Sequence, residues 1–261
     1  MQNLQPDYCF YATLLDAYQN YIDSGIIYEQ YWGWSENPPH TLEEFREQQF
    51  QSLINTLNRV PFDSEAADRG TAFNEIIDCI IDHRNSDKVK ISKIYSSAMN
   101  DGNPSTLVAL NATYNNREFI FPIKLCMEFA DYYKGAITQQ YVEAILPTAL
   151  GKVKLYGYID ELMPSSVHDI KTTSSYSVGK FKKHYQHLVY PYCLCRGGNN
   201  VTTFEYNVAE LGKNGSYKTY TETYEFNASR DIPILQNTCE ELIRFIQDNR
   251  SLITNPKLFN K

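Results

Sequence analysis

The chain has 261 residues, of which 43% are hydrophobic and 21% are charged, which supports one domain with a sizeable core and excludes a disordered chain. Its formal net charge of −7 argues against tight, nonspecific coating of nucleic acid. No run of eighteen apolar residues occurs, and the first six residues lack a signal-peptide pattern, so we expect a protein of the cytoplasm that makes no membrane contact.

Six cysteines are spread along the chain without a Cys-x-x-Cys pair: Cys9, Cys79, Cys126, Cys193, Cys195 and Cys239. This spread predicts reduced, mostly buried thiols rather than disulfides. A zinc site is an alternative for four residues that lie close in sequence: His184, His187, Cys193 and Cys195. Such a site would need an unusual helix-to-loop geometry, so the sequence disfavours it.

The first 62 residues are expected to form a helical N-terminal part. Thr41 and Glu44 have the spacing of a capping box, which predicts a helix over residues 42–59. After a proline, a second helix is predicted over residues 65–84.

A β-hairpin is predicted over residues 105–121, with its turn at Asn115 and Asn116. Residues 122–134 follow as a helix, and residues 141–145 as a strand.

Two surface features have alternative interpretations. The aromatic run of residues 31–34 is expected to pack or to clamp a loop, and a base-stacking platform is the alternative. The Asn115-Asn116 turn is expected to be an ordinary sheet edge, and a wedge at a duplex end is the alternative.

The most informative stretch holds two predicted strands, Tyr156–Asp160 and Val167–Thr173, joined by a short polar loop. Both strands alternate and are rich in β-branched and aromatic residues. Residues two apart in a strand point to the same side, so Asp169 and Lys171 share a face. A hairpin would return the chain and bring Asp160 beside Asp169.

Two carboxylates and an ammonium group suit the cleavage of phosphodiesters. A divalent ion held by carboxylates polarises a phosphoryl oxygen and activates water at neutral pH. Oxygen ligands favour Mg²⁺ or Mn²⁺ over zinc. Lys171 would orient the attacking water or stabilise the negative charge that develops on oxygen.

A helix is predicted over residues 178–190. Gln186 and Tyr190 are four apart and would lie on one face, with Lys182 one turn earlier. A cation, an amide and a phenol in a row suit a phosphate backbone. The alternative is a solvated amphipathic helix with Tyr190 packed on the sheet.

Positive charge is concentrated in the same region. Residues 171–204 contain five lysines or arginines and no acidic residue. Within this basic segment, Lys182 and Lys183 are expected to contact the substrate.

After two strands at residues 202–209 and 217–226, with a turn at 214–215, a final helix is predicted over residues 232–249. These elements predict an α/β fold with a mixed central β-sheet flanked by helices. One domain with three parts is expected: an N-terminal helical part, a catalytic core and a C-terminal helix, over residues 1–62, 63–230 and 231–261.

The ordered motifs resemble the PD-(D/E)XK nuclease superfamily, above all its RecB-like branch, which includes phage recombination exonucleases and CRISPR-adaptation nucleases. The resemblance spans about residues 69–190 and is carried by five motifs: Arg69-Gly70-Thr71, Tyr141-Val142-Glu143, Gly157-Tyr158-Ile159-Asp160, Asp169-Ile170-Lys171-Thr172 and Gln186-x-x-x-Tyr190. It implies a restriction-endonuclease-like core.

The resemblance also implies roles for the matching positions. Asp160 and Asp169 would be metal ligands, with the Ile170 carbonyl, and Lys171 would be the catalytic lysine. Glu143 would be an accessory acidic group near the metal. Gln186 and Tyr190 would position the substrate or the helix that carries them.

One position departs from the family pattern. The histidine of the first motif, a metal ligand in the family, is Asn74 here, and Asp78 lies one helical turn further on. An amide oxygen still binds Mg²⁺, though it is a poorer ligand for Mn²⁺ than imidazole. Either Asn74 or Asp78 would therefore take the histidine's place. The cysteine pattern that holds an iron–sulfur cluster in some relatives is missing, so no cluster is expected.

We therefore expect a Mg²⁺- or Mn²⁺-dependent deoxyribonuclease, an exonuclease of recombination, repair or phage DNA processing in a bacterium or a phage-infected cell. The expected partners are DNA, as duplex ends or single strands, and a single-strand annealing protein, a helicase or another recombination protein. No P-loop is present, so no nucleotide cofactor is expected. A structure-specific or nicking endonuclease, and an inactive binding module of the nuclease fold, remain alternatives.

Overall fold

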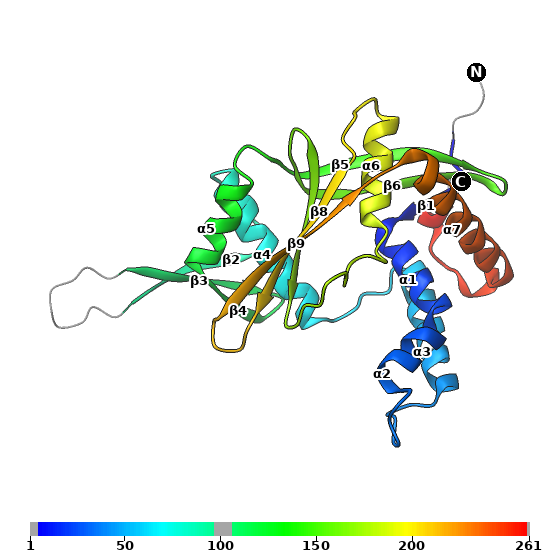
Figure 1. Ribbon diagram of the computed structural model, residues 1–261, viewed down its shortest axis with the longest axis horizontal. Coiled ribbons are helices and arrows are strands. Elements are labelled where there is room, and N and C mark those ends of the chain that lie inside the picture. Colours follow the sequence, from blue (N-terminus) through cyan, green and yellow to red (C-terminus); the bar gives the residue numbers. More distant parts are fainter. Residues whose placement is uncertain (1–4, 97–105, 260–261) are drawn as a thin grey trace.

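The computed structural model describes residues 5–96 and 106–259, and its centre is a mixed six-stranded sheet (Figure 1). The strand order is β1-β6-β7-β8-β9, and β5 also pairs with β6. Strand β5 runs along nearly the whole length of β6, whereas β1 and β7 pair with separate short segments of it, residues 153–156 and 161–162. The pairs β1–β6 and β7–β8 are parallel, and the others are antiparallel. The strands are β1 (Tyr8–Tyr11), β5 (Ile137–Thr148), β6 (Gly151–Leu162), β7 (Ser166–Thr173), β8 (Thr203–Leu211) and β9 (Tyr217–Glu225).

A smaller antiparallel sheet has the order β2-β3-β4, formed by β2 (Lys90–Tyr95), β3 (Leu107–Tyr114) and β4 (Arg117–Pro122). The predicted hairpin is β3–β4, although residue 105 lies outside the described residues. Asn115 and Asn116 have φ values of 47° and 61°, as a two-residue turn of type I′ requires. The Asn115 side-chain amide donates to Asp68 of the helix Glu65–Ile81 (α4) at 2.8 Å, which fixes this turn against the domain.

Helices flank the central sheet (Figure 1): α1 (Ala12–Ile22), α2 (Ser24–Trp32), α3 (Leu42–Leu57), α4 (Glu65–Ile81), α5 (Ile123–Tyr132), α6 (Gln186–Arg196) and α7 (Ala228–Asp248). Two short 3₁₀ turns follow α7, at Arg250–Leu252 and Pro256–Leu258. The predicted capping box of Thr41 and Glu44 begins α3. The prediction of an α/β fold with a mixed central sheet flanked by helices is confirmed.

Two hydrophobic cores hold these layers together. The larger core joins the sheet to α1, α3, α6 and α7, with Phe10, Leu155 and Phe204 fully buried. The smaller core joins α4 and α5 to the small sheet, and Ile170 of β7 packs into it. Because successive strand residues point to opposite sides, Asp169 and Lys171 point away from the smaller core and face α6.

The sequence predicted a helical N-terminal part, but this part also contains a strand, β1. Strand β1 runs parallel to β6 and pairs with residues 153–156. Its four residues are too few to show a clear period, and a parallel partner far along the chain leaves no local signal. The aromatic run at residues 31–34 is divided: Trp32 packs on Phe45 with ring centroids 5.2 Å apart, whereas Trp34 is exposed.

The helix predicted over residues 178–190 is wrong in its first half. Residues 178–183 form successive turns, and α6 begins only at Gln186. Gly179 has a φ of +79°, and the Tyr185 amide donates to the Asp16 carboxylate at 2.7 Å rather than to a helical carbonyl. Lys182 therefore does not lie on the helix face of Gln186 and Tyr190.

Within the described ranges, no helix has both the length and the apolar character needed to cross a membrane.

Candidate functional site

The site lies where strands β6 and β7 separate. They pair only at Glu161–His168 and Leu162–Val167, and then diverge. Beyond this fork the Ile170 amide, which would otherwise bond to the backbone of β6, donates to Asp160 Oδ2 at 2.9 Å. The side chain of Asp160 thus fills the fork and lies next to the backbone that follows Asp169.

Helix α4 supplies a second donor to the same carboxylate. Asn74 Nδ2 donates to Asp160 Oδ2 at 3.0 Å. The other amide atom, Asn74 Oδ1, is buried and has no hydrogen-bond partner among the described residues. A buried oxygen without a partner is unfavourable unless a cation or water satisfies it. Asn74 therefore contacts Asp160 through its amide nitrogen, while its amide oxygen lacks a partner among the described residues.

Lys171 joins the second carboxylate to α6. Its Nζ lies 2.6 Å from Asp169 Oδ2 and donates to Gln186 Oε1 at 2.8 Å. Gln186 Nε2 in turn donates to Asp169 Oδ1, so lysine, aspartate and glutamine form a closed triangle. Gln186 is also 3.4 Å from the Tyr190 hydroxyl, its neighbour on the next turn of α6.

A glycine of β6 makes room for this arrangement. A Cβ on Gly157 would lie 2.5 Å from Cε1 of Tyr190, which is closer than real side chains approach. The phenol ring therefore packs directly on the β6 backbone, and it fixes α6 beside the fork. The close approach of the Tyr190 ring therefore explains why the Gly-x-Ile-Asp motif has glycine at position 157.

The electrostatics favour a cation at the fork. Burial and the nearby Asp169 raise the pKa of Asp160 to about 8, although Lys171 opposes the shift. Burial disfavours the Lys171 ammonium, but Asp169 and Asp160 outweigh it, so the pKa of Lys171 is raised. If both carboxyl groups were ionised, two negative charges would face one ammonium, and a bound cation would offset the second.

The donor set at the fork fits a hard cation. It consists of two carboxylates, from Asp160 and Asp169, and the amide of Asn74, whose unpartnered oxygen would face a cation beside Asp160 once the amide is turned over; all are oxygen donors of the kind Mg²⁺ and Mn²⁺ accept. Across the described ranges, no group of three or more His, Cys, Asp or Glu residues is placed to hold a metal ion, which includes the alternative zinc set. A third protein ligand at the fork would therefore come from the Asn74 amide, since the Ile170 backbone meets Asp160 through its N–H.

Two predicted acidic groups lie outside this cluster. Glu143 pairs with Tyr156, four residues before Asp160, which is about 13 Å along a strand. Its carboxylate accepts from the Tyr141 hydroxyl at 2.5 Å and lies 3.4 Å from Lys154 Nζ, and the Tyr141 contact lowers the pKa of Glu143.

Asp78 lies on the Asn74 side of α4 but is buried beside Glu161 instead of contacting Asp160. Arg84 lies 3.8 Å from its carboxylate. Burial and the neighbouring Glu75 raise the pKa of Asp78 to about 6, and burial with Asp78 raises that of Glu161 to about 9. These two carboxyl groups form a second acidic pair, which we call the sealed pair.

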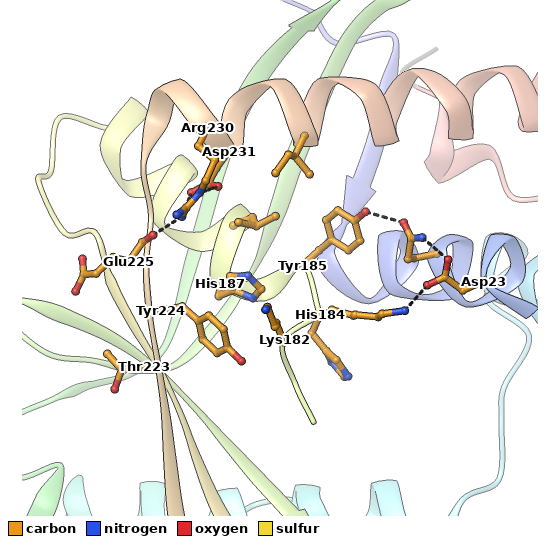
Figure 2. A pocket seen from close by; sticks show the side chains of 14 residues that line it. Asp23, Lys182, His184, Tyr185, His187, Thr223, Tyr224, Glu225, Arg230 and Asp231 are labelled. Atoms are coloured by element: carbon orange, nitrogen blue, oxygen red, sulfur yellow. Dashed lines mark hydrogen bonds and ion pairs between the residues drawn. The ribbon is translucent and has the colours of Figure 1, made fainter. Parts of the chain in front are cut away.

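The predicted basic contacts line a different cavity, of about 570 Å³ (Figure 2). Lys182 and Lys183 border it together with His184, His187 and Tyr224. Lys183 forms an ion pair with Asp23 at 2.7 Å, and the ring of His187 stacks on Tyr224. No residue of the fork lines this cavity, so these two lysines are not part of the same cluster.

The fork instead opens into a groove of about 560 Å³. Its lining combines fork residues with aromatic and cationic groups: Asp160, Gln186, Tyr190, Tyr156, Tyr158 and Arg59. The last three were not predicted as site residues. Tyr156 and Tyr158 share the Asp160 face of β6, which strand alternation alone could have indicated, whereas Arg59 reaches the groove from the end of α3, far from Asp160 in the sequence.

Asp16 of α1 was also missed. Its carboxylate accepts from the Tyr185 amide at 2.7 Å and lies 3.4 Å from His184 Nδ1. Burial raises the pKa of Asp16 to about 7, and Lys171 opposes the shift. Asp16 thus ties α1 to the start of α6, and a contact between residues 169 positions apart leaves no local signal in the sequence.

Comparisons with known proteins leave the family open. No family model and no curated protein match this chain. One solved structure, titled "Crystal structure of SSO0001", superposes with a TM-score of 0.41 at 9% sequence identity, over 92% of this chain and 79% of that one. A likeness at this level carries no argument about function.

Proposed function

We propose that the chain is a metal-dependent nuclease of the PD-(D/E)XK type, with a restriction-endonuclease-like core, that hydrolyses phosphodiester bonds in DNA. The observation that carries the proposal is the fork itself. Asp160 and Asp169 lie on two diverging strands, and Lys171, two residues after Asp169, is held by Gln186 at 2.8 Å.

The fork residues have distinct tasks in this proposal. Asp160, Asp169 and Asn74 would hold Mg²⁺ or Mn²⁺, which when bound supplies Lewis-acid activation of the phosphodiester and of water. Lys171 would donate hydrogen bonds to the oxygen on which negative charge develops. Gln186 would fix the direction of the Lys171 ammonium, and Asp160 would face the substrate because it lines the groove.

A cleavage assay tests the proposal. Wild type is incubated with linear single strands, linear duplex and closed circular DNA, each with Mg²⁺, Mn²⁺ or EDTA. We expect cleavage with either metal, none with EDTA, and a loss of about 10³-fold in Lys171→Ala. Lys124→Ala is the matched control, since Lys124 is exposed on α5 far along the chain from the fork.

The substrates separate the kinds of nuclease. Cleavage of linear DNA alone supports an exonuclease of recombination, repair or phage DNA processing, whereas cleavage of closed circles supports a structure-specific or nicking endonuclease. A folded wild type that cleaves nothing with either metal contradicts the proposal. Under it, the partners would be DNA and a single-strand annealing protein, a helicase or another recombination protein.

A further inference from the structure

Four tyrosine rings form a continuous row on the open face of β1, β5 and β6. Ring centroids are 5.8 Å apart for Tyr11–Tyr156, 6.5 Å for Tyr156–Tyr141 and 5.1 Å for Tyr141–Tyr158. Tyr158 is 58% exposed and Tyr141 39% exposed, which is unusual for large rings on a central sheet. We call this row the tyrosine ladder.

The ladder leads directly to the fork. Tyr156, Tyr158 and Asp160 are every second residue of β6 and therefore share one face, while the alternate residues Leu155 and Ile159 are buried in the core. Tyr156, Tyr158 and Asp160 also line the same groove. A chain bound along the ladder would thus reach the proposed metal ligand.

Two cations flank the rings. The Arg59 guanidinium lies 5.3 Å from the centre of the Tyr11 ring and donates to the Tyr156 hydroxyl. Both contacts are with neutral groups, and no ion pair of Arg59 occurs among the described residues. Lys154 Nζ lies 5.7 Å from the centre of the Tyr156 ring, and its charge is offset by Glu143.

The backbone of Arg59 is held in a conformation that favours glycine. Its φ is +53°, directly after the end of α3. The amides of Arg59 and Val60 donate to the carbonyls of Thr56 and Asn55, which is the bond pattern of a helix terminus that ordinarily carries glycine at this position. A charged residue at a position that favours glycine for folding indicates a task for its side chain.

We propose that the tyrosine ladder binds single-stranded nucleic acid and guides it to the fork, an inference that rests on the proposed nuclease function. Exposed rings stack on bases of any sequence, and such stacking needs unpaired bases, since the faces of paired bases are covered by their neighbours in the duplex. Arg59 would bind a backbone phosphate. The substrate class is therefore a single strand or the unpaired end of a duplex.

A binding measurement tests this separately from cleavage. Labelled single-stranded and blunt duplex oligonucleotides are titrated with the full chain by fluorescence anisotropy, with Ca²⁺ in place of Mg²⁺. We expect wild type to bind the single strand more tightly than the duplex. Tyr158→Ala and Tyr141→Ala should each weaken single-strand binding by about 5- to 150-fold. Tyr158→Phe, which keeps the ring, should bind as wild type does.

Two further variants control for loss of stability and for the loss of an exposed tyrosine elsewhere on the surface. Arg59→Gly suits the backbone conformation, so it should unfold no more easily than wild type, yet it should bind more weakly and with a salt dependence reduced by about one phosphate contact. Tyr95→Ala removes a tyrosine of similar exposure, 52%, from the small sheet, and should bind as wild type does.

The outcomes separate the two proposals. Single-strand binding that is absent, or unchanged in Tyr158→Ala, Tyr141→Ala and Arg59→Gly, overturns the ladder and leaves the nuclease proposal standing if DNA is still cleaved. Ladder-dependent binding without cleavage by wild type keeps the ladder as a binding site and removes the nuclease.

Discussion

Two neighbouring residues of β6 belong to two different acidic pairs, and the contrast shows what makes a buried carboxylate a candidate ligand. Asp160 lines a groove and lies in the fork with Asp169 and Lys171. Glu161 is 0% exposed and lies in the sealed pair with Asp78, which is 1% exposed. Burial raises the pKa of both Asp160 and Glu161, so burial alone does not distinguish them.

The two carboxyl groups differ in their access to the groove and in the cations that lie beside them. The cations beside the sealed pair are engaged by Glu75, which receives Arg84 at 2.7 Å and Lys88 at 2.9 Å. The cation at the fork, Lys171, is held on the groove side by Gln186. The sealed pair is therefore a structural cluster, and the fork pair is the one that a substrate can reach.

The largest expected effect belongs to Asp160→Asn. Cleavage should fall by about 10³-fold, because a charged oxygen beside the scissile phosphate is lost. In EDTA at pH 8 the free energy of unfolding should rise by about 1 kcal/mol, since a buried carboxylate becomes a neutral amide. Activity and urea unfolding measure the two effects, and an active Asp160→Asn protein would contradict the role of the fork.

Glu161→Gln should also gain stability at pH 8 but, unlike Asp160→Asn, should keep its activity. A pKa raised to about 9 means that the folded state binds a proton more tightly than the unfolded chain, so stability declines as pH rises from about 4.5 to 9. The amide removes this penalty. We expect the variant to be more stable by about 1 to 3 kcal/mol at pH 8, about equal to wild type at pH 4, and as active as wild type.

Urea unfolding at both pH values, with the cleavage assay alongside, checks this expectation. A loss of activity in a well-folded Glu161→Gln protein would mean that the sealed pair takes part in function.

Gly157→Ala tests the packing behind the fork. The new methyl group would meet the Tyr190 ring at 2.5 Å, displace it and loosen Gln186. We expect kcat to fall by about 10-fold and the free energy of unfolding by about 1 to 3 kcal/mol. Gly70→Ala is the matched control, because its methyl group meets Thr172 at an ordinary 3.5 Å and alanine favours a helix. Equal behaviour of the two variants would refute the steric role of Gly157.

The smallest effect is expected for Glu143→Gln. Glu143 lies about 13 Å along the sheet from Asp160 and is bound to Tyr141 and Lys154. Cleavage with Mg²⁺ should stay within about 3-fold of wild type, as for surface changes remote from the reacting atoms. A loss as large as that of Asp160→Asn would mean that the acidic group of β5 moves to the fork when substrate binds.

The Asp169–Lys171 contact and the position of Asp160 beside the backbone that follows Asp169 could be predicted, because strand alternation and a short hairpin are local properties. Gln186 and Tyr190 could be predicted as neighbours for the same reason, since a spacing of four residues defines a helix face. The α/β class likewise followed from local patterns of alternation and capping.

Features that depend on distant parts of the chain were not predictable in this way. Asp16 satisfies the Tyr185 amide from 169 residues away, and this contact replaces the expected first turns of α6. The tyrosine ladder exists only because β1 and β5 pair with β6. Glu143 was expected near the metal from the resemblance alone, and its distance of about 13 Å from Asp160 follows from the register of β5 on β6, which the sequence does not give.

Binding of Mn²⁺, titrated by calorimetry in wild type, Asp160→Asn and Glu161→Gln, tests the contrast between the two pairs most directly. We expect wild type and Glu161→Gln to bind the ion with similar affinity, and Asp160→Asn to lose that binding. Binding that survives in Asp160→Asn and disappears in Glu161→Gln would place the cation at the sealed pair, and would contradict the fork as the metal site.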